Sequence, residues 1–288
     1  MNRSTERLQR TIASPALIEG TGYITGKHVH LRFLPAPASS GVVFIRADLG
    51  PDARIKARVD SVTGTNRRTT LGAAPLSVEL VEHVLAALSG LRIDNCVVEL
   101  DAPEPPGLDG SAAAFVAVLR EAGVVAQTAK RGCYGVDQTL VVRNGDATLS
   151  LHPGDGDGLR VSYLLDYGTP SPIVRQVFTA DIVPETFVNE IAGCRTFLLE
   201  EEALMLQKQG IGKNSRMSDL LVFGPNGPRD NKLRFGNEPA RHKILDILGD
   251  LSLLGHDLRG HIVAYRSGHP LNIELARALQ AKTAKQAA

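Results

Sequence analysis

The sequence of 288 residues is poor in features that mark several classes of protein. Its 3 cysteines, Cys96, Cys133 and Cys194, form no Cys-x-x-Cys pair, which predicts neither a disulfide framework nor a cysteine-ligated zinc site. No apolar run reaches the ~18 residues that a membrane span requires, and Met1–Arg7 lacks the apolar core of a secretory signal. The formal net charge is only +1, without the basic excess of nucleic-acid-binding proteins. We therefore expect a cytoplasmic protein with no membrane span and no nucleic-acid partner.

What the chain does contain is ordinary for a globular protein. Hydrophobic residues make up 43% and charged residues 22%, so a chain of this length can bury a large core. At ~150 residues per domain, the length favours two domains. Four segments show the apolar spacing of helices, and a glycine directly follows three of them. The predicted helices cover Ser77–Ser89, Ser111–Ala122, Leu198–Gln209 and Pro239–Gly255.

Short β-type runs alternate with these helices. They cover His28–Phe33, Val42–Arg46, Cys96–Leu100, Ala147–His152, Leu159–Leu165, Leu220–Phe223 and Ile262–Tyr265. The Gly- and Asp-rich segment Gly154–Gly158 predicts a hairpin turn between two of them. The order of elements in the first half is echoed coarsely in the second, with a boundary near Ala126–Arg131. We predict an α+β protein of two domains, 1–126 and 127–288, each with a sheet and helices on one face.

Three groups of polar residues could carry chemistry, and the first is the pair Glu82-His83 inside the predicted helix Ser77–Ser89. Neighbouring helical residues point ~100° apart, so these two side chains cannot easily chelate one metal together. They can instead place a ligand and a carboxylate on either side of a metal-bound water. From the dipeptide alone, a half-exposed pair with no role is the simpler interpretation.

The second group lies on the predicted helix Pro239–Gly255. His242, Asp246 and Asp250 are spaced at i, i+4 and i+8, so they share one helix face with a rise of roughly 6 Å per step. The neighbouring leucines indicate a largely buried helix, where unpaired charges cost on the order of several kcal/mol. The His-x-x-x-Asp step matches the reach of two ligands on one zinc. An amphipathic helix with ordinary His–Asp pairs is the alternative.

The third group is Ser267-Gly268-His269-Pro270, which follows the apolar strand Ile262–Tyr265. A histidine at a strand end beside glycine is well placed for a mobile catalytic role. Taken alone, it is more simply a turn histidine.

The three groups together favour a zinc amidase. Two histidines and one aspartate make a three-ligand site with the fourth position open, and zinc there lowers the pKa of water to ~7 and polarises an amide carbonyl. Glu82 can take the proton of the water, and a protonated His269 can protonate the leaving nitrogen or stabilise the oxyanion. Asp250 can orient His269, and Lys243 can offset developing negative charge.

At these residues the chain resembles the family of UDP-3-O-acyl-N-acetylglucosamine deacetylases. The order and approximate spacing of the shared motifs hold from about Thr11 to Lys282. The motifs are Gly20-x-Gly22 with Thr25-Gly26-Lys27, Pro35-Ala36-Pro37-Ala38, Val81-Glu82-His83 with Ala86-Ala87-Leu88, Ile93-Asp94-Asn95, Ala102-Pro103-Glu104, Asp109-Gly110-Ser111-Ala112-Ala113, Arg195-Thr196-Phe197, Leu233-Arg234-Phe235, Arg241-His242-Lys243 with Asp246, Gly249-Asp250, and Ser267-Gly268-His269.

The resemblance implies a sandwich of two α+β domains, with the helices packed between the two sheets and the active site at the domain junction. It implies zinc-dependent removal of acetate from an acylated UDP-amino sugar, the committed step of lipid A synthesis. By motif match, the ligands of a single zinc ion would be His83, His242 and Asp246. Glu82 would be the general base, and His269, oriented by Asp250, would be the general acid or electrostatic partner. We expect a monomer whose partner is this small-molecule substrate.

The resemblance also assigns residues to the substrate. Thr196 and Lys243 would assist the oxyanion and the substrate, and Phe197 would contact the sugar. The fatty chain would lie in an apolar passage built partly from a strand-helix-strand insert near 196–223. Its candidate lining residues are Leu199, Leu204, Ile211 and Leu220, for which simple core packing is the alternative. Arg266, where the family usually has Lys, could pair with the diphosphate.

Three departures from the family pattern keep other interpretations open. Tyr23-Ile24 stands where a Gly-x-His-Ser/Thr-Gly motif is usual, so that histidine is absent. Asn214-Ser215-Arg216, after Lys213, replaces a Gly-Gly-Ser-like turn, and Thr70-Leu71-Gly72 also differs. A related zinc amidase acting on another nucleotide sugar or N-acyl amine is one alternative, and a non-catalytic homologue is another. A His₂Asp site also accepts Fe²⁺ or Co²⁺.

Overall fold

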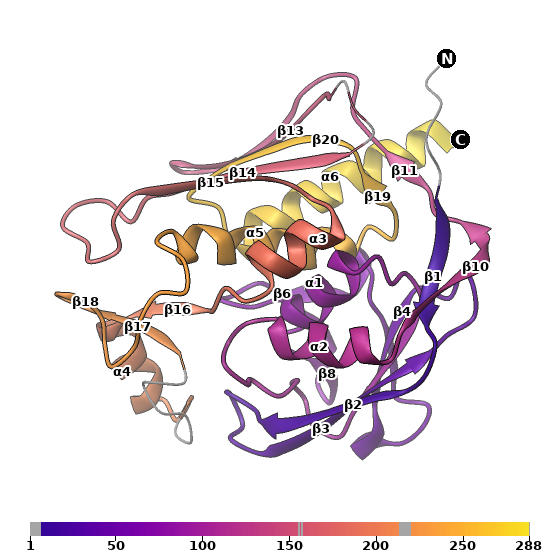
Figure 1. Cartoon of the computed structure of the whole chain (residues 1–288), viewed down its shortest axis with the longest axis horizontal. Coiled ribbons are helices and arrows are strands. Elements are labelled where there is room, and N and C mark those ends of the chain that lie inside the picture. Colours follow the sequence, from indigo (N-terminus) through magenta and orange to yellow (C-terminus); the bar gives the residue numbers. More distant parts are fainter. Residues whose placement is uncertain (1–6, 155, 157, 213–219, 288) are drawn as a thin grey trace.

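The fold is a sandwich in which helices lie between two five-stranded sheets, as Figure 1 shows. A computed structural model describes residues 7–154, 156, 158–212 and 220–287. One sheet belongs to the first half of the chain and the other to the second half. The predicted α+β sandwich with internal helices is therefore confirmed.

The first sheet has the strand order β2-β3-β9-β4-β5. Its strands are β2 (Ala16–Thr21), β3 (His28–Pro35), β9 (Cys96–Leu100), β4 (Val42–Arg46) and β5 (Arg54–Lys56). β9 runs parallel to β4, and the other neighbours are antiparallel. Burial alternates along β3, so Val29, Leu31 and Phe33 face the helices while His28 and His30 face outward.

The second sheet repeats this arrangement, with the order β12-β13-β20-β14-β15. Its strands are β12 (Leu140–Asn144), β13 (Ala147–His152), β20 (Gly260–Tyr265), β14 (Leu159–Leu165) and β15 (Gln176–Asp181). The parallel pair is again formed by the third and fourth strands in this order, β20 and β14. The predicted hairpin between β13 and β14 is wrong, because β20 from the end of the chain lies between them.

The helices of the middle layer are α1 (Glu82–Gly90), α2 (Ala113–Glu121), α5 (Glu238–Ser252) and α6 (His269–Ala287), with the short α3 (Pro184–Thr186) and the π-helical turn η3 (Phe187–Ile191). All four predicted helices exist, but three begin later than predicted, of which α2 begins two residues later. Leu76–Val78 pairs as β8, and the left-handed Leu80 (φ 56°) prevents a helix from starting before Glu82. Phe197–Leu199 pairs as β16, so the next helix starts at Glu200.

Two small sheets extend the sandwich. One contains β6 (Val62–Gly64), β7 (Thr70–Ala73) and β8, and the other contains β16, β17 (Leu221–Gly224) and β18 (Gly227–Pro228), with α4 (Glu200–Lys208) linking β16 to the parallel β17. The predicted strand-helix-strand insert thus matches β16, α4 and β17.

The remaining elements are two two-stranded pairs and two 3-10 turns. They are the pair β1 (Leu8–Ile12) and β10 (Val124–Lys130), the pair β11 (Cys133–Tyr134) and β19 (Asp257–Leu258), and the 3-10 turns η1 (Ala47–Leu49) and η2 (Val59–Ser61). The predicted boundary at 126/127 falls inside β10, so the division into domains stays a prediction.

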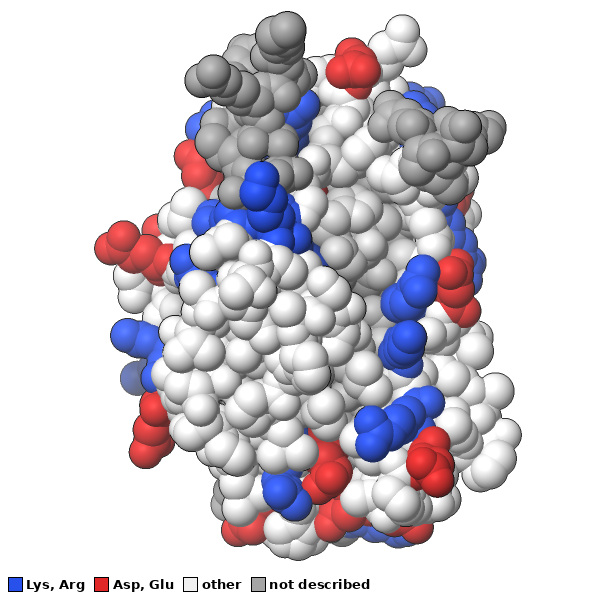
Figure 2. Space-filling model, turned by 90° about the vertical axis from the view of Figure 1, so that its right-hand side faces the viewer, with Lys and Arg blue, Asp and Glu red and all other residues white. Residues whose placement is uncertain are grey.

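On the face in Figure 2, Lys and Arg side chains form a group at the upper left and a series down the right-hand part, with Asp and Glu beside several of them. Uncharged side chains fill much of the area between. This agrees with the formal net charge of +1. Among the described residues, no helix has the length and apolar character needed to cross a bilayer.

Candidate active site

Close packing of α1 against α5 brings the three polar groups of the sequence together. Gly249 makes this possible, because a Cβ there would lie 2.1 Å from the backbone oxygen of Glu82. Glu82 and His83 open α1, and His242 and Asp246 project from α5 toward them. His269 is the first residue of α6, so it belongs to a helix rather than to a loop.

His83, His242 and Asp246 form a group that could hold a metal ion. Their ligand atoms all lie within 4.8 Å of one another. Asp246 Oδ1 is 3.3 Å from His242 Nε2 and 3.8 Å from His83 Nε2. Among the residues that the structure describes, this buried oxygen has no hydrogen-bond partner, which is costly for a carboxylate unless a cation completes it. The donor set and the orphaned oxygen therefore fit a bound metal.

The tautomer of His242 also suits a ligand. Its Nδ1 lies 3.0 Å from the carbonyl oxygen of Cys194, which can only accept, so Nδ1 carries the hydrogen and Nε2 is free. Burial lowers the pKa of His242 to about 4, which keeps the ring neutral at pH 7. Burial by itself would raise the pKa of Asp246, but His242 and Lys243 hold it well below its usual range. Neutral imidazole and ionised carboxylate are the forms that bind metal.

Glu82 and His269 face each other beside this group, with Glu82 Oε1 3.9 Å from His269 Nε2. Both side chains are buried. Burial raises the pKa of Glu82, and the nearby His269 and His83 oppose that rise. Burial alone would lower the pKa of His269, but Asp250, Glu82 and Asp246 together raise it to about 9. The pair thus combines a carboxylate with a histidine that is protonated at neutral pH.

Asp250 orients His269 through a 2.8 Å hydrogen bond from Nδ1 to Oδ2. Two residues that the sequence analysis missed complete this network. The Thr69 hydroxyl donates to Asp250 Oδ1 at 2.6 Å, and its backbone N–H donates to Glu82 Oε2 at 3.1 Å. Asn272 Nδ2 donates to Asp250 Oδ2 at 2.8 Å. Thr69 therefore links the carboxylate and the histidine, and no local pattern around it indicates this.

Thr196 and Lys243 lie on the open side of the group. Thr196 Oγ1 is 3.4 Å from His83 Nε2 and 3.3 Å from His242 Nε2. Its backbone N–H donates to the carbonyl oxygen of Gly110 at 2.7 Å, which holds the hydroxyl in place. Lys243 Nζ donates to Asp246 Oδ2 at 2.8 Å. Burial alone would lower the pKa of Lys243, but Asp246 raises it overall.

A cavity of about 590 Å³ opens onto these residues. Glu82, His83, Thr196, Phe197, His242, Lys243, Asp246 and His269 all line it. Tyr167 and Arg67, which were not predicted, line it as well. The Phe197 ring packs edge-on against His242, with centroids 6.0 Å apart. Phe197 therefore supports the His242 ring and also lines the cavity. The cavity therefore brings together a group that could hold a metal ion, a carboxylate facing a histidine, and open space beside them.

An apolar pocket of about 130 Å³ adjoins this cavity, sharing Thr196, Leu198, Leu80 and Arg67 with it. Two of the four predicted lining residues, Ile211 and Leu220, line it. Leu199 and Leu204 do not belong to its lining, whereas their neighbours Leu198 and Leu206 do. Side chains alternate along β16, so Leu199 points away from the pocket, and Leu204 lies on the exposed face of α4.

Arg266 lies apart from the cavity. Its Nη2 is 3.0 Å from Asp166 Oδ2, and its Nη1 is 3.8 Å from Asp146 Oδ2. Among described residues, Arg67 is the arginine that lines the main cavity. It holds a left-handed backbone (φ 61°) and pairs with Glu202 at 2.9 Å. A non-glycine residue held at positive φ beside a cavity is a common feature of functional sites.

A sequence profile described as UDP-3-O-acyl N-acetylglycosamine deacetylase matches residues 9–281. The chain belongs to this family. A UDP-3-O-acyl-N-acetylglucosamine deacetylase of Nostoc sp. (strain PCC 7120) is 40% identical over 278 residues, which cover 95% of this chain and 98% of the relative. Relatives of the same name from Anaeromyxobacter sp. (strain Fw109-5) and Myxococcus xanthus (strain DK1622) are 40% and 38% identical, and they cover 93% of this chain and 87% and 85% of their own lengths.

One of the departures from the deacetylase family pattern lies at the apolar pocket. Tyr23 and Ile24 both line it, so an apolar side chain stands where a histidine is usual. The backbone N–H groups of Ile24 and Thr25 donate to the Glu104 carboxylate, which fixes this turn. Thr70-Leu71-Gly72 belongs to β7. Lys213 and Asn214-Ser215-Arg216 lie outside the described residues.

Proposed function

We propose that this chain hydrolyses the N-acetyl amide of UDP-3-O-acyl-N-acetylglucosamine and releases acetate, the committed step of lipid A synthesis. One observation carries the proposal: the group of partly buried His83 and buried His242 and Asp246 lies beside the Glu82–His269 pair in one cavity, and one Asp246 oxygen has no hydrogen-bond partner among the described residues. Relatives that are 38–40% identical over 93–95% of this chain bear the name of this activity. We further propose that the chain acts as a cytoplasmic monomer, which gel filtration with light scattering would check.

In this proposal, His83, His242 and Asp246 hold a single zinc ion. When bound there, zinc supplies Lewis acidity that polarises an amide carbonyl and acidifies water. The residues of the chain perform the proton transfers. Glu82 accepts the proton of the attacking water, and its burial favours a base whose pKa lies above that of an ordinary glutamate. His269 gives the proton from Nε2 to the departing nitrogen, so the products are acetate and a free amine.

The residues around the acid-base pair hold Glu82 and His269 in position and stabilise the negative charge that develops during hydrolysis. Asp250 and Thr69 keep His269 oriented, and the Thr69 N–H holds the Glu82 carboxylate in place. Thr196 and Lys243 lie where negative charge would develop on the carbonyl oxygen.

The two adjoining cavities suit the two parts of the substrate. The larger cavity, lined by Phe197 and Arg67, would receive the sugar and the negatively charged diphosphate. The apolar pocket, lined by Ile211 and Leu220, would receive the acyl chain. Leu199 lies on β16 outside the lining of this pocket. Arg266 is already paired with Asp166, so a role toward the diphosphate would require it to change partners.

A substrate panel tests the proposed specificity. Acetate release should be fastest from UDP-N-acetylglucosamine carrying a 3-O-acyl chain, and slow from the same sugar nucleotide without the chain. Activity confined to N-acyl amines without a lipid would favour a zinc amidase of another specificity. Absence of activity on every member, with metal bound, would favour the non-catalytic alternative.

The pH dependence tests the Asp250–His269 pair. Asp250 helps to raise the pKa of His269 to about 9, so the acid form is present below this pH and is lost as the pH rises through it. We expect kcat/KM to fall on the alkaline side near that value. Asp250→Asn should move this alkaline limb to lower pH by about one unit or more, because an adjacent opposite charge shifts a pKa by ~1–3. An unchanged alkaline limb in the variant, measured over pH 5–10, would assign it to another group.

The acyl pocket can be tested by filling it. Leu206 lines the pocket from α4, whereas Leu204 on the same helix is exposed. Leu206→Trp should raise KM for the acylated substrate by roughly tenfold, equivalent to about 1.4 kcal/mol of binding. Leu204→Trp is the matched control and should leave KM unchanged. Equal effects of both substitutions would show that the acyl chain binds elsewhere.

A further inference from the structure

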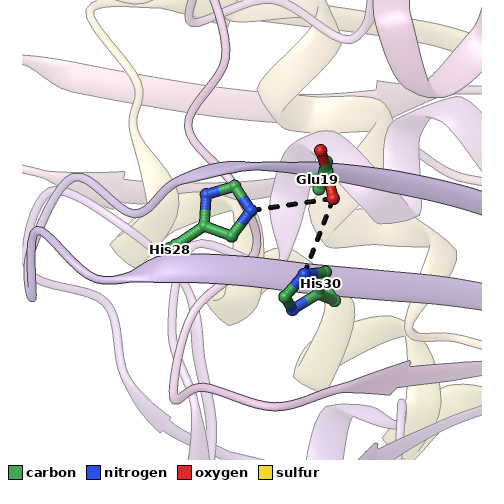
Figure 3. A group of neighbouring side chains, drawn as sticks. All are labelled: Glu19, His28 and His30. Atoms are coloured by element: carbon green, nitrogen blue, oxygen red, sulfur yellow. Dashed lines mark ion pairs between the residues drawn. The ribbon is translucent and has the colours of Figure 1, made fainter.

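A second histidine–carboxylate group lies on the outer face of the first sheet. Figure 3 shows His28 and His30 on one strand and Glu19 on the neighbouring strand. Glu19 is paired in register with His30, and His28 is two residues away on the same face of β3. All three side chains are exposed, on the side of the sheet opposite to the helices and to the candidate active site.

The spacing of the three groups matches a metal site. Glu19 Oε2 lies 3.6 Å from His28 Nε2 and 3.5 Å from His30 Nε2. Tetrahedral zinc with bonds of about 2.0–2.2 Å puts neighbouring ligand atoms about 3.3–3.6 Å apart. The ligand atoms of the group all lie within 4.8 Å of one another, and the two rings meet edge to face with centroids 4.9 Å apart. A cation would therefore fit with only small side-chain adjustments.

Asp101 prepares His30 for this role. Asp101 Oδ2 lies 2.8 Å from His30 Nδ1, and because a carboxylate only accepts, Nδ1 carries the hydrogen and Nε2 is left facing Glu19. The other oxygen, Oδ1, accepts the backbone N–H of His30 at 2.8 Å, which fixes the carboxylate on β3. A carboxylate behind a metal-binding histidine commonly orients the ring and raises its basicity as a ligand.

We propose that Glu19, His28 and His30 form a second metal site, which binds a divalent cation of the zinc class with the fourth position open to solvent. Two imidazoles and one carboxylate favour Zn²⁺ over Mg²⁺ and Ca²⁺, which prefer sets made of oxygen ligands. The site shares no residue with the candidate active site. Full occupancy would give two zinc ions per chain, one buried and one exposed.

Zinc counting and Zn²⁺ titration of the full chain test this inference. After equilibrium dialysis against Zn²⁺ alone, the wild-type chain should hold two ions and the variant His28→Ala/His30→Ala should hold one. Asp101→Asn should weaken binding of the exposed ion by about 10–100-fold, as loss of an orienting partner does. A large excess of Mg²⁺ should displace neither ion.

Arg32→Ala is the matched control, because Arg32 lies on the same strand as His30 and pairs with Glu99 rather than with this group. It should leave two ions bound. The variant His28→Ala/His30→Ala should deacetylate at the wild-type rate, and that rate would show that the variant is folded. An unchanged zinc count and affinity in this variant would overturn the second site. Loss of an ion from His242→Ala, in contrast, reports only on the buried site, so the two proposals fail separately.

Discussion

Replacing Glu82 by Ala is expected to leave zinc bound and to cut kcat by roughly 10²–10⁴, the usual cost of losing a general base. The carboxylate of Glu82 is buried and 3.9 Å from His269, but it does not belong to the His83-His242-Asp246 group. Its removal therefore takes away a proton acceptor without removing a ligand. Steady-state kinetics and a zinc count on the same preparation measure both effects.

Glu82→Gln refines this test, since the amide oxygen can still accept the Thr69 N–H while the side chain no longer acts as a base. It should be about as slow as Glu82→Ala. Glu121→Ala, which removes an exposed carboxylate from α2, is the control and should behave as wild type. A near-wild-type rate in Glu82→Gln would remove Glu82 from the role of base.

His242→Ala should abolish retention of the buried metal, and with it activity. One of three ligands is lost, and the Asp246 oxygen that lacks a hydrogen-bond partner loses its neighbour at 3.3 Å. The count is best made in a chain that also carries His28→Ala and His30→Ala, so that only the buried ion is measured. Less than a tenth of an ion per chain after dialysis is a rough expectation, against about one in the parent.

His152→Ala provides the control for this count, because His152 lies on β13 of the second sheet, away from the cavity. It should retain the buried ion. Near-stoichiometric zinc in the His242→Ala chain would contradict the assignment of His242 as a ligand.

Half of the site was predictable from one helix. The i, i+4 and i+8 spacing of His242, Asp246 and Asp250 fixes their common face whatever the helix packs against, and α5 keeps that spacing. Contact of this face with Glu82 and His83 depends on the packing of α1 across Gly249. Periodicity alone does not indicate which helix faces which, and the family resemblance supplied that step.

Other contacts carry no local signal. Thr69 reaches Asp250 across 181 positions of the chain, and neither residue's neighbours mark the pair. The resemblance offered Leu199 as a lining residue with core packing as the alternative, and a helix was predicted from Leu198; the segment is instead the strand β16, which has Leu198 rather than Leu199 in the pocket lining. The predicted hairpin at Gly154–Gly158 was wrong because β20, from the far end of the chain, lies between β13 and β14. The local sequence carries no signal of this pairing.

The central claim is that the cavity lined by Glu82, His242 and His269 performs metal-dependent deacetylation. It is tested most directly by assaying acetate release from 3-O-acylated UDP-N-acetylglucosamine before chelation, after chelation, and after zinc is added back. We predict activity that disappears with the metal and returns with about one equivalent of zinc in the His28→Ala/His30→Ala chain. Acetate release that persists in fully metal-free protein would contradict the claim. So would a failure of added zinc to restore acetate release to protein that is still folded.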